Sequence, residues 1–305
     1  MEVLSLMHQL FTLDIGGTFI KCAHVHADGT ISQPAEIPTS PERGGRDLLD
    51  RTIALAQAAI AQTSVDGIAI STAGQVNPQN GSIRFATDNL PGWTGIALQS
   101  EMARVTGLPC AVVNDVNAVA LGERWLGAAR DTDDALVLSL GTGIGGAIIS
   151  GGKLLLGKQG SAGEIGHLCL YPAGEFCTCG QHGCYERYAS AAALLRRATL
   201  LRLPSTGKAL FQSALEGDAQ CRALIDSWLA DVAQGIASLV FVLDPEIVIV
   251  GGGISAQGEA IAAPLEKKVR ERVMPSYRGA RIHPAQLGND AGLLGAASLL
   301  FSRLG

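Results

Sequence analysis

The sequence predicts an α/β protein with two lobes of related design, and three observations support this prediction. A strand, a glycine-threonine turn, a strand, a glycine hairpin and a third strand occur in that order twice, about 125 residues apart. Short apolar runs typical of buried strands alternate with stretches of helical periodicity along the rest of the chain. The length of 305 residues, with 47% hydrophobic residues, suits two cores of ordinary size.

The first half is expected to open with a three-stranded meander and to continue with helices and buried strands. Asp28-Gly29 is a two-residue hairpin signal, and Pro34 places the third strand at a sheet edge. Strands are expected at 10–15, 19–25, 30–38, 66–71 and 110–113, and helices at 46–62, 96–106 and 116–127. A long loop, which includes Trp93, is expected between the fourth strand and the second helix.

The second half repeats the meander, with Gly151-Gly152 as its hairpin turn, and then becomes mostly helical. Strands are expected at 135–140, 144–150, 153–157, 246–250 and 280–283, and helices at 190–200, 217–240, 257–273 and 290–303. We therefore expect residues 1–118 and 290–305 to form an N-terminal lobe, and residues 119–289 a C-terminal lobe.

Charge and hydropathy exclude several classes of partner. The net charge of −5 and the pI of about 5.7 argue against a nucleic-acid partner, which requires a basic surface. The N-terminal run MEVLSLMHQLFTLDIGG has no basic region and no small-residue cleavage site, so we interpret it as a first strand and not a signal peptide. No uncharged apolar run of about 18 residues occurs. We expect a cytoplasmic protein with a small-molecule partner and no membrane association.

The stretch from 164 to 186 concentrates residues that bind metal ions. Imidazole nitrogen and thiolate are the ligands of structural zinc sites, which take four of them. The candidate ligands are His167, Cys177, Cys179 and Cys184. Gly180 and Gly183 permit the tight turn that this spacing needs. Two alternatives stay open: Cys169 as a spare ligand, and His182 in place of His167.

Two glycine turns at equivalent points of the two halves suggest a phosphate site. In Gly16-Gly17-Thr18, backbone N–H groups and a hydroxyl can approach a phosphate, while Asp14 can hold a water of hydrated Mg²⁺. The turn GTGIGG at 141–146 resembles the first, and together they suit the β- and γ-phosphates of one nucleotide. The alternative is a pair of glycine hairpins without a ligand.

A third glycine turn, GGGI at 251–254, follows an apolar strand. It lacks the spacing of a dinucleotide-binding fingerprint, and no acidic residue ends a strand about 20 residues later. We interpret it as a wall for an adenosine.

Asn114 and Asp115 stand where a strand meets a helix, at the mouth of the expected sheet. There the Asp115 carboxylate could accept a proton from an attacking hydroxyl, as phosphoryl transfer requires. The alternative is that Asp115 caps the helix that begins at 116.

Polar side chains that both accept and donate hydrogen bonds suit the vicinal hydroxyls of a sugar. The candidates are Asn89, Asn114, Asp115, Glu164, His167 and Glu186. The alternative for Glu164 and Glu186 is solvated loop charge. We expect His24 and His26, two residues apart, to lie on a solvated strand face.

Six motifs in order make the chain similar to the ROK family of bacterial sugar kinases and sugar-responsive repressors. They are DIGGT-x-x-K (14–21), NDVNA (114–118), GTGIGG (141–146), AGEIGH (162–167), CTCGQHGCYE (177–186) and VGGGI (250–254). This resemblance implies the actin/hexokinase-like ATPase fold. It also implies ATP, Mg²⁺ and a structural Zn²⁺ as cofactors, and a homodimer whose contact surface lies in the C-terminal lobe.

The resemblance also implies a role for each matching residue. Asp115 matches the base that deprotonates the 6-hydroxyl of a hexose. The sugar-binding positions are Gly74, Asn89, Asn114, Asp115, Glu164, His167 and Glu186. The nucleotide positions are Asp14, Gly16, Gly17, Thr18, Lys21, Gly141, Thr142, Gly143, Gly251, Gly252 and Gly253. The zinc ligands are His167, Cys177, Cys179 and Cys184.

Kinase and repressor are the two functions open to such a chain. Repressors of the family carry a DNA-binding domain before the DIGGT motif, and only thirteen residues precede Asp14, so we expect a kinase. Phe19 stands where many members have lysine, and Ala73-Gly74 where many have proline-glycine. The segment STAGQVNPQNG (71–81) resembles N-acetylmannosamine kinases, which makes that sugar the first expectation, followed by glucose or a β-glucoside.

Overall fold

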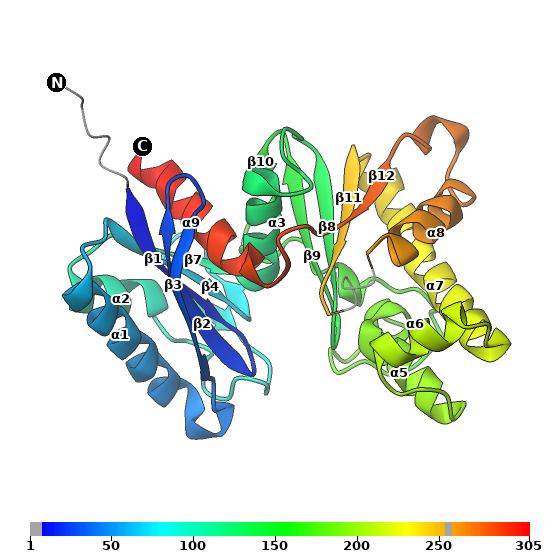
Figure 1. Cartoon of the computed structure of the whole chain (residues 1–305), viewed down its shortest axis with the longest axis horizontal. Helices are drawn as coiled ribbons and strands as arrows, with labels where there is room; N and C mark the ends of the chain where they lie inside the picture. The colour runs from blue at the N-terminus through cyan, green and yellow to red at the C-terminus, as the bar shows by residue number, and fades with distance from the viewer. Residues whose placement is uncertain (1–7, 254–257) are drawn as a thin grey trace. The chain divides into compact units, whose positions relative to one another are not determined.

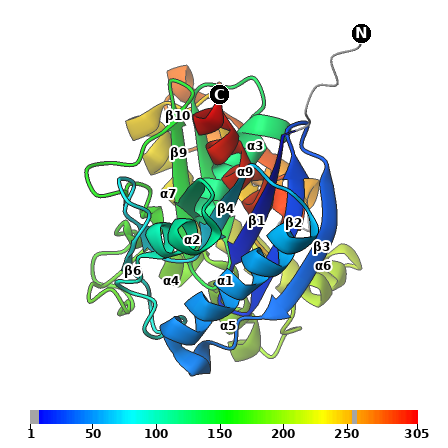
Figure 2. The ribbon, with the colours of Figure 1, turned by 90° about the vertical axis from the view of Figure 1, so that its left-hand side faces the viewer.

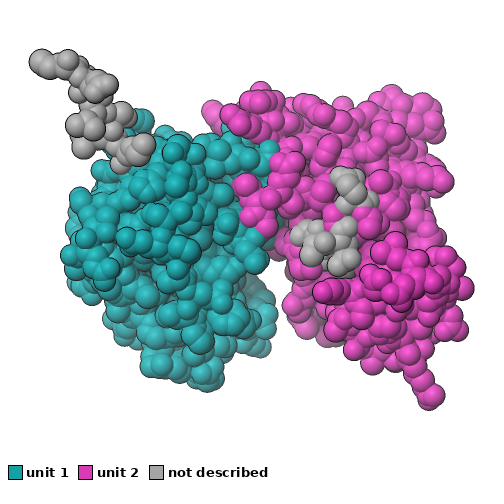
Figure 3. Space-filling view, viewed as in Figure 1, with its two compact units in different colours: residues 1–127, 156–162, 289–305 teal, residues 128–155, 163–288 magenta. Residues whose placement is uncertain are grey.

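The computed structural model describes residues 8–253 and 258–305, which form two compact units (Figures 1 and 3). Unit 1 comprises Met1–Gly127, Leu156–Ala162 and Asn289–Gly305, and unit 2 comprises Ala128–Leu155 and Gly163–Gly288. Residues 1–7, which belong to the N-terminal run interpreted above, and Ile254 of the third glycine turn lie outside the described residues.

Unit 1 is built on a five-stranded sheet in the order β3-β2-β1-β4-β7. β1, β2 and β3 form an antiparallel meander, and β4 and β7 continue the sheet parallel to β1. β3, which contains Pro34, lies at the edge, as predicted. The strands are β1 (Gln9–Ile15), β2 (Phe19–His26), β3 (Ile31–Pro38), β4 (Gly67–Thr72) and β7 (Cys110–Asn114).

Unit 2 repeats this arrangement with a sheet in the order β10-β9-β8-β11-β12. Again the first three strands in sequence are antiparallel, and the last two are parallel to the first. The strands are β8 (Ala135–Leu140), β9 (Ile144–Ser150), β10 (Lys153–Leu154), β11 (Ile247–Gly251) and β12 (Arg281–Pro284). The equal strand order in the two sheets confirms the predicted α/β fold with a duplicated core.

Helices cover both faces of the unit 1 sheet (Figures 1 and 2). On one face, α1 buries Leu48, Leu49 and Ile53, which recur at the spacing of one helical face and belong to the same buried cluster as Phe11 of β1. On the other face, α9 lies against β1 and β4 and packs on α3. The helices are α1 (Gly44–Gln62), α2 (Leu98–Thr106), α3 (Asp115–Leu126) and α9 (Ala291–Leu304), with the 3₁₀ turns η1 (Pro41–Arg43) and η5 (Gly288–Asp290).

The core of unit 2 forms around its longest helix, α7 (Ala219–Leu243). Asp218 begins the helix, because its Oδ1 accepts from the N–H groups of Gln220 (2.8 Å) and Cys221 (3.0 Å). The helix is long and apolar enough to cross a membrane, but more than half of it is buried inside the unit, which is typical of a core helix. The other helical elements are α4 (Glu186–Ala189), α5 (Ala191–Leu200), α6 (Gly207–Leu215), α8 (Glu259–Arg270), η2 (Ile165–His167) and η4 (Pro275–Tyr277).

The unit boundary differs from the expected one, which divided the chain between residues 118 and 119. That point falls inside α3, and the whole helix belongs to unit 1 because α9 packs along it. Gly295 of α9 approaches the Ala118 carbonyl so closely that a side chain there would overlap the backbone. A helix held along its length in this way cannot be shared between two units.

Three local predictions need correction. The expected loop after β4 contains a small hairpin, β5 (Gln75–Val76) with β6 (Ile83–Phe85), whose strands are too short to give a periodic pattern. Helix α6 was not predicted. His24 does not lie on a solvated face: only 3% of it is exposed, because β2 is an interior strand, and its ring packs edge-on to Phe11.

Candidate active site and metal centre

The carboxylate of Asp14 is held at the end of β1 by a neighbouring strand and a helix. Asp14 pairs in register with Ser71 of β4, and the Ser71 hydroxyl donates to Asp14 Oδ1 at 2.6 Å. Gly292 leaves room for this carboxylate, since a Cβ there would lie 2.7 Å from Asp14 Cγ. Burial raises the pKa of Asp14, while the Ser71 hydrogen bond and the charge of Lys21 act to lower it. The first glycine turn thus has a partly buried carboxylate beside it.

Asn114 begins helix α3 and also fixes its neighbour. Its Oδ1 accepts from the N–H groups of Val116 (3.0 Å) and Asn117 (3.1 Å), so Asn114 is the N-cap. Its Nδ2 donates to the Gly74 carbonyl (3.0 Å) and to Asp115 Oδ1 (2.7 Å). The helix therefore does not depend on Asp115 as its cap.

Asp115 is the first residue of α3 and has a raised pKa. Burial is the main cause and the charge of Asp14 is the second, and together they raise the pKa of Asp115 to about 6, although hydrogen bonds from Val116 and Asn114 act to lower it. Within residues 8–253 and 258–305, no hydrogen bond reaches Asp115 Oδ2. Such a carboxylate can accept a proton from a substrate near neutral pH.

The first glycine turn is firmly held but open at its tip. The Gly16 N–H donates to the Phe19 carbonyl (3.0 Å), and Thr39 Oγ1 donates to the Gly16 carbonyl (2.7 Å). Gly17 and Thr18 are exposed, and a Cβ on Gly17 would meet nothing within 4 Å. The turn therefore offers open backbone that a phosphate group could approach.

Two other predicted sugar positions in unit 1 differ in how they are held. Gly74 has a φ of +100°, which favours glycine, and its carbonyl accepts the hydrogen bond from Asn114. Asn89 is exposed in a turn, and no hydrogen bond described in the structure joins it to Asn114 or Asp115. Trp93 nearby is fully buried, with its indole N–H donating to Thr72 Oγ1 (3.1 Å), so it packs the core.

In unit 2 the four predicted metal ligands come together. The ligand atoms of His167, Cys177, Cys179 and Cys184 all lie within 4.8 Å of one another. Cys179 Sγ and Cys184 Sγ are 3.5 Å apart, and Cys177 Sγ and His167 Nδ1 are 3.8 Å apart. Zinc–sulfur bonds of about 2.3 Å in a tetrahedron give edges of about 3.8 Å, so this cluster fits one such ion.

The two alternative ligands lie outside the cluster. Cys169 is exposed, with its Sγ 3.8 Å from the His182 carbonyl. The His182 ring lies against Phe176 and has its Nδ1 3.1 Å from the Gly174 carbonyl.

The segment before the metal loop packs closely against β9 because glycines there have no side chains. A Cβ on Gly163 would lie 2.6 Å from the Gly146 carbonyl, and a Cβ on Gly166 would overlap the Ile144 carbonyl. Glu164 and His167 belong to this segment, in which the His167 N–H donates to the Glu164 carbonyl (3.2 Å). Backbone contact without side chains therefore sets where Glu164 and His167 stand.

Glu186 adjoins both the metal cluster and the second glycine turn. It is the first residue of α4, two residues after Cys184. Its Oε1 accepts from Cys177 Sγ at 3.2 Å and lies 3.9 Å from His167 Nδ1. Its Oε2 lies against Gly143, in the space that a side chain on Gly143 would fill. The metal loop and the turn at 141–143 therefore share one carboxylate.

The second and third glycine turns lie side by side in unit 2. The Gly141 N–H donates to the Gly143 carbonyl (3.0 Å), which leaves Thr142 exposed at the tip. Gly251 pairs with Ser139 in the sheet, and Gly252, with a φ of +89°, approaches Leu140 so closely that a Cβ would lie 2.5 Å from its carbonyl oxygen. The carboxyl end of β11 thus lies beside the carboxyl end of β8, and Gly253 comes two residues after β11.

The sequence interpretation did not identify the residues that support these groups. Ser71 and Gly292 were not singled out, although Gly292 lies in the run DAGLLGAA at 290–297. The link from Glu186 to Gly143 could not be anticipated either, because 43 positions separate the two residues.

Comparisons with known proteins give matches over nearly the whole chain. The model of the ROK family matches residues 10–303. A glucokinase of Thermotoga maritima is 36% identical, over 97% of this chain and 98% of its own length. An N-acetylmannosamine kinase of Escherichia fergusonii is 33% identical, over 94% and 96%. The crystal structure of a ROK family glucokinase from Streptomyces griseus, in complex with glucose and AMPPNP, superposes with a TM-score of 0.82 at 35% identity, covering 97% of this chain and all of that one. The chain belongs to the ROK family.

Proposed function

We propose that this member of the ROK family is a sugar kinase that transfers the terminal phosphoryl group of ATP to the 6-hydroxyl of a hexose or N-acetylhexosamine. Its relatives support a sugar kinase, and one is bound to glucose and an ATP analogue. The observation that carries the proposal is the arrangement of Asp115, which Asn114 orients and whose pKa is raised by burial and by the nearby charge of Asp14. These relatives do not support a sugar-sensing regulator better than they support a kinase.

In the proposed reaction Asp115 acts as the general base. The sugar hydroxyl oxygen attacks the γ-phosphorus, the bond from that phosphorus to the ADP oxygen breaks, and the hydroxyl proton passes to Asp115 Oδ2. The transition state of phosphoryl transfer is loose, so the proton moves late and a carboxylate suffices as the base. The Asn114 amide holds Oδ1, which leaves Oδ2 for the proton.

The glycine turns suit a nucleotide. Gly16, Gly17 and Thr18 offer open backbone and a hydroxyl. Lys21 of β2 lies directly opposite Asp14 of β1 in the sheet. In unit 2 the corresponding groups are Gly141, Thr142 and Gly143, with Gly251, Gly252 and Gly253 beside them as a surface for the adenosine. Mg²⁺ would neutralise part of the negative charge on the phosphates, and the partly buried Asp14 carboxylate would hold a water of its hydration shell.

We propose that the Cys₃His cluster holds a structural zinc ion. Four protein ligands at tetrahedral separations leave no open position, so the ion would stabilise the loop and take no part in phosphoryl transfer. The residues that the loop presents to a sugar would be Glu164, His167 and Glu186. Glu186 touches the cluster directly, and its carboxylate pairs well with two neighbouring hydroxyls.

The sugar that we favour is N-acetylmannosamine, with glucose or a β-glucoside next. The segment 71–81 supports this choice, and relatives with the first two specificities align over nearly the whole chain. We propose a cytoplasmic location and a homodimer that associates through unit 2. Apolar side chains exposed on that unit, such as Val242 (79%) and Met274 (54%), support such a contact.

The test is ATP consumption by the purified protein with each of N-acetylmannosamine, N-acetylglucosamine, glucose, fructose, allose and a β-glucoside. The expected result is turnover with one or two of these sugars, with N-acetylmannosamine giving the highest kcat/KM. The position of the phosphate on the product, read by ³¹P–¹H NMR, tests the 6-hydroxyl. The absence of turnover with every sugar would contradict the proposed activity, and light scattering of the same sample tests the dimer.

A further inference from the structure

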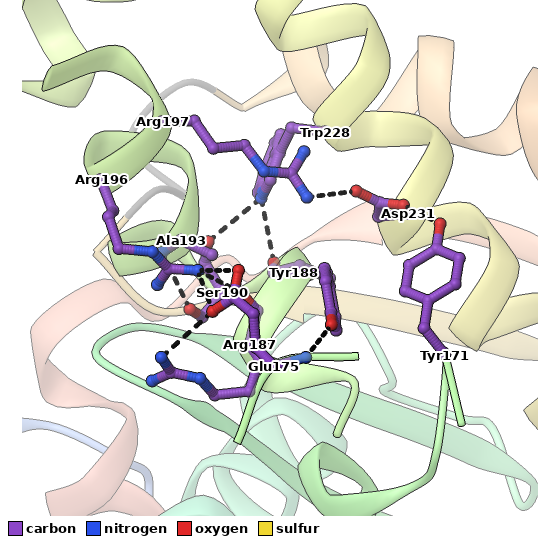
Figure 4. Close-up of polar contacts among 11 residues, drawn as sticks. Tyr171, Glu175, Arg187, Tyr188, Ser190, Ala193, Arg196, Arg197, Trp228 and Asp231 are labelled. Atoms are coloured by element: carbon purple, nitrogen blue, oxygen red, sulfur yellow. Dashed lines mark hydrogen bonds and ion pairs between the residues drawn. The ribbon is translucent and has the colours of Figure 1, made fainter. Parts of the chain in front are cut away.

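The metal loop is fastened to the helices of unit 2 by side chains that are not metal ligands (Figure 4). The Tyr171 hydroxyl donates to Asp231 Oδ1 at 2.6 Å, and Arg197 donates to Asp231 Oδ2 at 2.6 Å. Asp231 lies on α7 and is only 8% exposed, and Arg197 comes from α5. A buried carboxylate with two strong donors thus joins the loop to two helices.

The tip of the same loop has a second attachment. The Glu175 N–H donates to the Tyr188 hydroxyl at 2.5 Å, and the Glu175 carboxylate accepts from Arg196 (2.8 Å) and Arg187 (3.1 Å). The rings of Tyr171 and Tyr188 meet edge to face, with centroids 4.7 Å apart. Because the Glu175 side chain is 42% exposed, its ion pairs contribute little, and the more buried Asp231 is the stronger anchor.

The Tyr171 backbone bears directly on the ligands. The Gly183 carbonyl accepts from the N–H groups of Leu170 (2.7 Å) and Tyr171 (3.2 Å), and a side chain on Gly183 would overlap the Tyr171 carbonyl. Gly183 immediately precedes the ligand Cys184. Any displacement of Tyr171 therefore displaces Cys184.

The other side of Cys184 is anchored on the same turn of α7. Tyr185 is fully buried, and its hydroxyl donates to the Val232 carbonyl at 2.7 Å. Gly235 makes room for the Tyr185 ring. The chain before and after Cys184 is thus attached to α7 at two consecutive residues, Asp231 and Val232.

We propose that Asp231 is a positioning residue for the metal centre: with Tyr171 and Arg197 it places the loop so that the Cys₃His ligands meet an ion at their binding separations. Fixing the ligands in advance lowers the entropy lost when the metal binds, and removal of groups behind the ligands typically reduces metal affinity about 10- to 100-fold. The inference rests on the proposed zinc site and does not depend on the kinase activity.

The experiment measures the zinc dissociation constant of the full chain by competition with a chromophoric chelator. Tyr171→Phe keeps the ring and the Asp231–Arg197 ion pair and loses only the hydroxyl, so it is the variant least able to disturb folding. Tyr277→Phe is the matched control, since Tyr277 packs against Phe241 in another part of unit 2. Asp231→Asn removes the negative charge that Tyr171 and Arg197 share.

The expected result is a zinc affinity about tenfold lower in Tyr171→Phe, lower still in Asp231→Asn, and unchanged in Tyr277→Phe. Unchanged zinc affinity in Tyr171→Phe would overturn the inference, whether or not Asp231→Asn folds. Equal losses in Tyr171→Phe and Tyr277→Phe would also overturn it. Wild-type protein that binds no zinc would reject both the zinc site and this inference, while leaving the kinase assay to decide the activity separately.

Discussion

The Glu186 carboxylate lies against the Cα of Gly143, in the space that a side chain would occupy at that position. Glu186 Oε1 also lies 3.2 Å from the Sγ of the ligand Cys177, so one carboxylate touches the metal cluster and the second glycine turn. A residue proposed to bind sugar and a turn proposed to bind phosphate are therefore packed together within unit 2.

Gly143→Ala is expected to weaken sugar binding although the mutated turn belongs to the nucleotide site. The new Cβ would push Glu186 aside, and we expect roughly a tenfold higher dissociation constant for the sugar, the loss of about one charged hydrogen bond. Gly141→Ala is the matched control, because a Cβ there would meet nothing within 4 Å. Calorimetric titration with sugar alone, without nucleotide, checks this; equal affinities in the two variants would show that the contact is unimportant for sugar binding.

Substitutions of Asn114 separate its two roles. Asn114→Ser retains an oxygen that can cap α3 but loses the amide that holds Asp115, whereas Asn114→Ala loses both. Both variants should lose most of their turnover, and only Asn114→Ala should be destabilised, by about 1 kcal/mol. Urea unfolding together with kcat checks this. Full activity in Asn114→Ser would mean that the amide does not orient the base.

The raised pKa of Asp115 predicts a pH dependence of both activity and stability. A base must be ionised, so kcat/KM should fall as the pH falls below about 6. The folded state holds this proton more tightly than the unfolded chain, whose ordinary carboxylate pKa is 3.8. The stability contributed by Asp115 is thus complete below pH about 4 and lost as the pH rises through about 6.

Asp115→Asn should therefore be more stable than the wild type at pH 7.5, with a free energy of unfolding higher by an amount on the order of 1–3 kcal/mol. Its melting temperature should be correspondingly higher. The difference should disappear near pH 4, where wild-type Asp115 is protonated. Asp88→Asn, at an exposed position, serves as the control. A melting-temperature difference that does not change between pH 4 and pH 7.5 would argue against the raised pKa.

Cys179→Ser is expected to lose zinc and to bind sugar more weakly, because Glu186 and His167 depend on the loop for their positions. Cys169→Ser, at an exposed thiol outside the cluster, should retain both zinc and sugar affinity. Metal analysis and sugar titration of the two variants check this. Normal sugar affinity in zinc-free Cys179→Ser would restrict the metal to a role in folding.

The sequence was sufficient for most of the architecture and for the set of candidate groups, because both rest on local patterns. Strand–glycine turn–strand repeats predicted the duplicated sheets, and the spacing of His167 and the three cysteines predicted the cluster. It could not decide whether Asp115 is a base or the cap of α3, since aspartate often caps helices; in the structure the Asn114 side chain is the cap.

What the sequence could not show depends on contacts between distant segments. Ser71 reaches Asp14 only because β4 lies beside β1 in register, and Gly292 matters only because α9 begins against that carboxylate. The burial of His24 follows from the position of β2 inside the sheet. None of these positions has a distinctive local pattern.

The kinetics of Asp115→Asn test the central claim most directly. With the preferred sugar and ATP, the account predicts a kcat lowered at least about a hundredfold, with the dissociation constant for the sugar changed little, because the amide keeps the shape of the carboxylate and cannot take the proton. A kcat within a few-fold of the wild type, at unchanged sugar affinity, would contradict the assignment of Asp115 as the catalytic base.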